Sequence, residues 1–78
     1  MQPSLGRIVL VGADPATNNG SDTAPAIITR VWNDNVINAR VILDSDALQW
    51  RTSLTHTDNL DGLADDVRSA RWMWPPRV

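Results

Sequence analysis

Five short runs of β-branched and apolar residues alternate along the chain with clusters of turn-forming residues. The runs cover Arg7–Val11, Ala26–Trp32, Ala39–Leu43, Ala47–Thr55 and Ala70–Trp74. Strands at this close spacing, with no helical pattern longer than a few turns, are typical of a small closed or half-closed barrel. We therefore expect a mostly β chain in one domain spanning residues 1–78, folded as a small five-stranded antiparallel barrel of the Src-homology-3-like kind.

The segments between these runs differ in what they predict. Ala13–Thr23 is rich in turn formers and has no apolar period, so we expect a loop. Asn33–Asn35 and Asp44–Asp46 are expected to be turns. The acidic segment Thr57–Ser69 leaves two alternatives open, a structured loop or a short helical turn capped by Asp58.

The run Ala47–Thr55 shows the cleanest alternation in the chain. One face would carry Leu48, Trp50, Thr52 and Leu54, and the other Gln49, Arg51, Ser53 and Thr55. This pattern predicts a strand whose apolar face is buried and whose polar face meets water.

A chain of 78 residues without cysteine has few means of stabilising itself. Domains of this size bury only about 60% of the surface that the unfolded chain exposes. The absence of cysteine excludes disulfides and thiolate metal sites, and a single histidine, His56, excludes a histidine-rich site within one chain. Self-association is the remaining remedy, so we expect a homo-oligomer.

The charged residues are of only two kinds, because every cation is arginine and every anion is aspartate. Guanidinium groups suit phosphate or carboxylate ligands, which they bind in a bidentate way. The net charge of −2 argues against a partner made of duplex nucleic acid. The aspartate clusters lack the ligand spacing of a calcium loop, and we expect no metal or other cofactor.

The four tryptophans are the only aromatic residues. Each could fill a large part of so small a core, or could offer a flat indole on which a base stacks. Trp72 and Trp74 are two residues apart and would share a face of their strand. The sequence leaves both roles open.

Arginine stands beside tryptophan at Trp50-Arg51 and at Arg71-Trp72, and Arg30 lies two residues before Trp32. Guanidinium next to indole is the minimal equipment for binding a nucleotide. A solvated arginine covering a ring edge is the alternative explanation. His56, which directly follows the fourth run, is a further candidate for contact with the ligand. The candidate ligand-binding residues are Arg30, Trp32, Trp50, Arg51, His56, Arg71 and Trp72. No catalytic constellation can be built around one histidine, so we do not expect an enzyme.

Both ends of the chain resemble a family of short proteins encoded by phages, especially phages of actinobacteria. The resemblance is carried by residues 3–9 (PSLGRIV) and, most specifically, by residues 72–78 (WMWPPRV), with residues 25–32, 41–44 and 50–53 between them in the same order. Family members often have His-Tyr after the first valine, where this chain has Leu10-Val11. The resemblance implies a small β-barrel of phage origin.

These observations favour a phage accessory protein that sequesters a small anionic ligand, most concretely a nucleotide immune signal of the host. The alternative is a protein–protein interaction module, or a structural phage component, that uses an exposed tryptophan patch. No apolar run is long enough for a membrane span and the N-terminus lacks the features of a signal peptide. We therefore expect no membrane contact and a location in the cytoplasm of the infected bacterial host.

Overall fold

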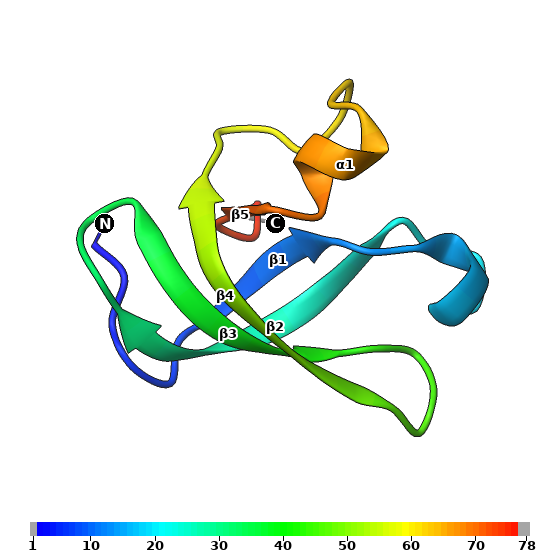
Figure 1. Ribbon diagram of the computed structural model, residues 1–78, viewed down its shortest axis with the longest axis horizontal. Helices are drawn as coiled ribbons and strands as arrows, with labels where there is room; N and C mark the ends of the chain where they lie inside the picture. Colours follow the sequence, from blue (N-terminus) through cyan, green and yellow to red (C-terminus); the bar gives the residue numbers. More distant parts are fainter. Residues whose placement is uncertain (1, 77–78) are drawn as a thin grey trace.

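Five strands close into a single barrel in the computed structural model, which describes residues 2–76 (Figure 1). Each strand pairs with the next along the chain, and β5 returns to pair with β1. The strands are β1 (Ile8–Gly12), β2 (Thr23–Val31), β3 (Val36–Ile42), β4 (Leu48–His56) and β5 (Arg71–Met73). The mostly β fold and the five-stranded barrel predicted from the sequence are confirmed.

The expectation of a purely antiparallel barrel is wrong, because β4 and β5 run parallel. The reason is geometric. Strand directions cannot alternate all the way around a closed ring of five, so at least one pair of neighbours must be parallel. Here that pair follows the longest connection, residues 57–70, which carries the chain back before β5 begins.

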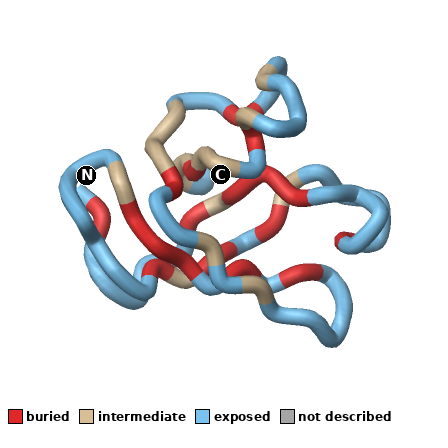
Figure 2. Tube along the Cα trace, in the orientation of Figure 1, coloured by how far each residue is buried: buried red, intermediate tan, exposed pale blue. Residues whose placement is uncertain are grey.

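The core is made of small and β-branched side chains that point into the barrel, with one indole among them. The buried apolar residues of β2 and β3 lie at every second position, Ala24 to Ile28 and Ile37 to Val41, as the alternation of strand side chains requires (Figure 2). Asn38, between two of them, is buried as well. The buried apolar cluster of the strands consists of Val9, Val11, Ala24, Ala26, Ile28, Ile37, Ala39, Val41, Leu54 and Trp72.

The facing predicted for the fourth strand is wrong over most of its length. Opposite β3, the pairs Ile37–Leu54 and Ala39–Arg51 enclose one residue of β3 but two of β4, which is a β-bulge at Thr52 and Ser53. Ser53 has a φ of 57°, in the left-handed region. The extra residue reverses the facing, so Leu54 points inward while Leu48 and Trp50 point outward.

A helical turn does interrupt the acidic segment, as one of the two alternatives expected. It is α1 (Asp65–Arg68), which begins seven residues after the proposed cap Asp58 and has no side-chain cap at Ala64. The turn packs against β1 and β5 (Figure 1). The loop between β1 and β2 contains a single 3₁₀ turn, Pro15–Thr17, whose cap is the Asp14 carboxylate.

Candidate interaction surface

The outer surface of β2, β3 and β4 carries large apolar and aromatic side chains that are open to solvent. Across β3 and β4, Arg40 lies opposite Trp50, and Ile42 opposite Leu48. Leu48 is 61% exposed and Trp50 is 55% exposed. We call this surface the outer face and define it by residues Ile27, Arg30, Trp32, Arg40, Ile42, Leu48 and Trp50.

Trp32 lies at the opposite end of the outer face from Leu48 and is held in one orientation. Its Nε1 donates a hydrogen bond of 2.9 Å to Oδ1 of Asn38, on β3. The Arg30 guanidinium lies over the indole, 4.0 Å from the ring centroid, which is a cation–π contact. The indole nevertheless remains 51% exposed, so it is a rigid aromatic group presented to solvent.

Asn38 is the polar group that organises this end of the outer face. It is only 6% exposed, and its Oδ1 accepts from three donors: Trp32 Nε1, Thr52 Oγ1 at 2.8 Å and the Ser53 backbone N–H at 3.0 Å. A bulge leaves a backbone N–H without an acceptor on the neighbouring strand, and the asparagine side chain provides that acceptor here. Asn38 therefore fixes both the β4 bulge and the Trp32 indole.

We expect Asn38→Ala to lower the free energy of unfolding by about 1–3 kcal/mol, because the Ser53 N–H and two side-chain donors lose their acceptor. Denaturation in urea measures the loss. Asn59→Ala is the control, since Asn59 Oδ1 accepts one hydrogen bond in an exposed turn. Equal losses in the two variants would contradict an organising role for Asn38.

The strands carry arginine but no aspartate. All nine aspartates lie in the connections or in α1, and none lies in a strand. The strands instead carry Arg30, Arg40, Arg51 and Arg71. The outer face therefore presents two guanidinium groups among apolar side chains and no carboxylate, although the whole chain has a net charge of −2.

The structure brings three of the candidate ligand-binding residues together on this surface: Arg30, Trp32 and Trp50. It also adds Arg40, which sequence reasoning missed. The signal was available, since Arg40 is two residues from Ile42 and two from Asn38, and side chains at that spacing share a face of a strand.

Arg51 does not belong to this surface, because the β4 bulge turns it inward. Its guanidinium donates to the backbone carbonyls of Gly12 and Ser69, and to Gln49 Oε1 at 3.0 Å. Burial lowers the pKa of the Arg51 guanidinium below its ordinary value. These hydrogen bonds join β4 to the end of β1 and to the end of α1. They do so along a part of β4 that does not pair with β5.

Trp72, Arg71 and His56 lie at the junction of β4 and β5. Trp72 has no exposed surface, and its Nε1 donates to the Asn35 carbonyl at 3.0 Å, so no face of this indole is open to a base. The His56 ring packs edge-on against it with centroids 4.7 Å apart. Arg71 donates to the Ala70 carbonyl at 3.3 Å.

A hollow of about 260 Å³ lies beside His56. It is lined by Gln2, Asp34, Asn35, His56, Trp72 and Trp74. The candidate arginines are absent from this lining, and one of its polar groups is the Asp34 carboxylate. The hollow therefore combines His56 with aromatic edges and a carboxylate, and no arginine is among its lining residues, although the Arg7 guanidinium lies 5.3 Å from the centroid of the Trp74 ring.

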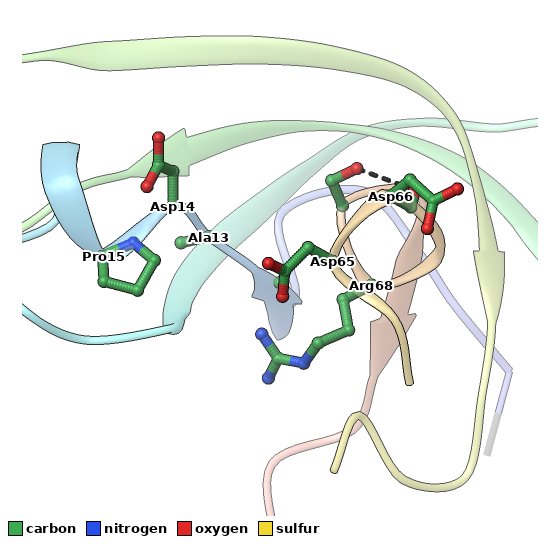
Figure 3. A pocket seen from close by; sticks show the side chains of 8 residues that line it. Ala13, Asp14, Pro15, Asp65, Asp66 and Arg68 are labelled. Carbon is green, nitrogen blue, oxygen red and sulfur yellow. Dashed lines mark hydrogen bonds between the residues drawn. The ribbon is translucent and has the colours of Figure 1, made fainter. Parts of the chain in front are cut away.

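A second hollow, of about 380 Å³, lies between the β1–β2 loop and α1 (Figure 3). Three aspartates are among its lining residues, Asp14, Asp65 and Asp66. The Arg68 side chain also contributes to its wall, but its guanidinium is used by protein acceptors. Carboxylates at this density repel a phosphate, so the hollow is unsuited to a nucleotide.

Comparison of the chain with protein-family models, with curated proteins and with solved structures found no match. Within residues 2–76, no cluster of three histidine or carboxylate side chains is arranged to hold a metal ion. No helix in the same part of the chain is long and apolar enough to cross a membrane. The outer face is thus the surface from which a function can be argued.

Proposed function

We propose that the protein is a non-catalytic interaction module that binds a protein partner through the outer face. The observation that carries this proposal is the exposure of Trp50, Leu48 and Trp32, each more than half open to solvent, on one contiguous surface that includes two arginines. If the chain has the phage origin that its resemblance implies, the partner is a host protein or a virion protein.

The composition of the outer face supports a protein partner. Tryptophan and arginine are the residues most enriched at binding hot spots, and aspartate is depleted from interface cores. The outer face has two tryptophans, two arginines and no carboxylate. Ile27, Ile42 and Leu48 add aliphatic surface, which packs against protein side chains but gives no stacking or hydrogen bonds to a nucleotide.

The sequestering of a small nucleotide, expected from the sequence, stays a prediction with less support. Small ligands are usually held in hollows that cover most of their surface. The outer face is open, the hollow between the β1–β2 loop and α1 is acidic, and Arg51 gives its guanidinium to protein acceptors. These features favour a partner with an extended surface of its own.

The proposal is tested by quantitative affinity capture from a lysate of the cells in which the chain is naturally made. Leu48→Ser and Trp50→Ser should each reduce recovery of the specific partner at least tenfold, because each removes a large exposed apolar contact. Leu5→Ser is the matched control, since Leu5 is 69% exposed but lies outside the outer face. Its recovery should equal that of the wild type.

Two results would contradict the proposal. One is recovery of the same proteins by all variants, which would place the contact elsewhere. The other is a nucleotide released when the purified wild-type protein is heated, detected by mass spectrometry, together with loss of that nucleotide in a Trp32→Ala variant. That pair of results would support the sequestering function instead.

A further inference from the structure

We infer that the partner bound by the outer face presents an acidic segment, in which a carboxylate pairs with Arg40 and an apolar side chain two residues away enters a hollow beside Ile42. The inference rests on the proposed function and names the chemistry of its partner. Its evidence is the position of the Arg40 guanidinium among apolar side chains, next to a hollow on the same surface.

Arg40 lies in a row of outward-facing side chains that crosses the sheet. It is exposed, and it stands opposite Ile27 on β2 and opposite Trp50 on β4. Ile27 is in turn opposite Ile8 on β1, which is 46% exposed. A partner that covers the indole and the aliphatic side chains of this row must therefore also cover the guanidinium between them.

The Arg40 guanidinium has no hydrogen bond, ion pair or aromatic contact within residues 2–76. Arg51 and Arg68, by contrast, donate to backbone carbonyls of the chain itself. A guanidinium that is covered without an acceptor loses its hydration and gains nothing in return. The partner must therefore supply an acceptor, and a carboxylate both accepts from the N–H groups and balances the charge.

The carboxylate is expected at Arg40 rather than at Arg30. Arg30 already stacks on Trp32, and the turn that follows Trp32 carries Asp34, a carboxylate of the chain itself. Arg40 lies away from this turn, within β3. Of the two cations of the outer face, Arg40 therefore gains more from a carboxylate on the partner.

A third hollow, of about 400 Å³, adjoins Arg40 on the same surface. Pro25 precedes Ile27 by two residues on β2, and Ile42 follows Arg40 by two residues on β3, so all four side chains face outward. Pro25 and Ile42 both line the hollow, which therefore begins where the row of Ile27 and Arg40 ends. Its lining residues are Asn18, Ser21, Thr23, Pro25, Ile42, Leu43 and Asp44.

The walls of this hollow are held by the Asn18 side chain, which is 2% exposed. Its Nδ2 donates to the carbonyls of Ser21 and Thr23 at 3.0 and 3.1 Å, and its Oδ1 accepts from the Asp44 N–H at 2.7 Å. The hollow is thus formed before a partner arrives, which lowers the cost of binding. Because Asp44 is among the lining residues, an uncharged side chain is favoured there over a carboxylate.

The spacing of the two contacts suits an extended segment. Arg40 and Ile42 are two residues apart on one strand, which corresponds to about 7 Å along the strand. Alternate side chains of an extended partner segment lie on one face at the same separation. The partner's carboxylate and its apolar side chain are therefore expected two residues apart.

Selection from a displayed library of random twelve-residue peptides on the purified protein tests the inference. The wild type should enrich peptides with aspartate or glutamate two residues from an apolar residue. Arg40→Glu should instead enrich lysine or arginine at the same place, because the charge that the peptide must balance is reversed. Circular dichroism establishes that the variant is folded, as expected for an exposed position.

A double-mutant cycle on one selected peptide locates the pairing. Replacing the acidic residue of the peptide by its amide should weaken binding to the wild type at least tenfold, measured by fluorescence polarisation. The same replacement should change binding to Arg40→Gln less than twofold, because the guanidinium is already absent. Arg71→Gln is the matched control, since it removes the same charge outside the outer face and should bind the peptide as the wild type does.

The hollow is tested with the same peptide. Ile42→Asp should weaken binding at least tenfold, because it replaces an apolar lining residue by a carboxylate. Leu5→Ser is the control, because Leu5 is an exposed aliphatic residue outside the outer face. Equal binding by the two variants would contradict the place given to the apolar side chain.

Enriched peptides without an acidic residue, or with an affinity that Arg40→Gln leaves unchanged, overturn the inference. So does a selection that enriches no peptide whose binding is lost in Trp50→Ser. Loss of lysate capture by Leu48→Ser and Trp50→Ser, with no effect of Arg40→Gln on that capture, overturns the acidic segment and leaves the proposed function standing. Acidic peptides that depend on Arg40, together with a lysate capture that no variant changes, do the reverse.

Discussion

Replacing Trp72 with alanine should lower the free energy of unfolding by about 3–5 kcal/mol, the usual loss for truncating a fully buried tryptophan. Trp72 has no exposed surface, and Trp74 packs on it at right angles with centroids 5.2 Å apart. Its Nε1 also satisfies the Asn35 carbonyl. Domains of this kind have a total stability of about 5–15 kcal/mol, so the variant should be partly or wholly unfolded at room temperature.

Urea denaturation followed by circular dichroism measures this effect. Trp50→Ala is the matched control, because the same side chain is removed from a site that is 55% exposed. Its loss should lie within about 0.5 kcal/mol, as for most surface substitutions. A larger loss for Trp50→Ala than for Trp72→Ala would mean that β4 and β5 present the opposite faces to the core.

The positions of the strands could be predicted from the sequence because strand signals are local. Each run of β-branched residues ends at a turn cluster, and the five runs overlap the five strands. The starts of β2 and β3 were predicted three residues late. Thr23 and Val36 begin these strands, and neither is part of a conspicuous apolar run.

The facing of β4 could not be predicted in the same way. Its alternation places Leu48, Trp50 and Leu54 on one side, and only the bulge at Ser53 separates Leu54 from the other two. A bulge depends on a partner for the extra backbone donor, and that partner is Asn38 on another strand. No local pattern contains this information.

The roles of the arginines were the least predictable part of the site. Arg51 and Arg71 neighbour tryptophans in sequence, as Arg30 does, yet only Arg30 contacts the ring of its neighbour. Proximity in sequence does not determine what a long side chain reaches across a barrel. Arg51 reaches Gly12, which is 39 residues away along the chain.

Arg68 illustrates the same limit, and its replacement is the second large effect that we expect. It is 5% exposed, and its guanidinium donates to the carbonyls of Leu60 and Asp22 and to Thr23 Oγ1. These acceptors belong to the start of β2 and to the connection before α1, so one side chain joins segments that no strand pairing holds together. The sequence gives no sign of this, since Arg68 lies in an acidic segment without tryptophan.

Arg68→Met should lower the free energy of unfolding by about 3–5 kcal/mol. Methionine keeps most of the apolar stem of arginine, so the packing of the methylene groups next to the backbone is preserved. What is lost is the set of hydrogen bonds, and each buried acceptor left without a donor costs about 1–3 kcal/mol. Arg40→Met is the control on the outer face and should change stability by no more than about 0.5 kcal/mol.

The carbonyls, rather than the carboxylate of Asp22, should account for the effect of Arg68. The ion pair between them is long, at 3.7 Å, and the Asp22 side chain is 66% exposed, where such pairs contribute about 0–1 kcal/mol. Asp22→Ala removes the carboxylate but keeps the backbone carbonyl that Arg68 also uses. We therefore expect Asp22→Ala to cost less than about 1 kcal/mol in the same urea experiment. If it costs as much as Arg68→Met, the ion pair holds α1 to β2, and the stability of the protein should then fall with added salt, which the hydrogen-bonded arrangement does not require.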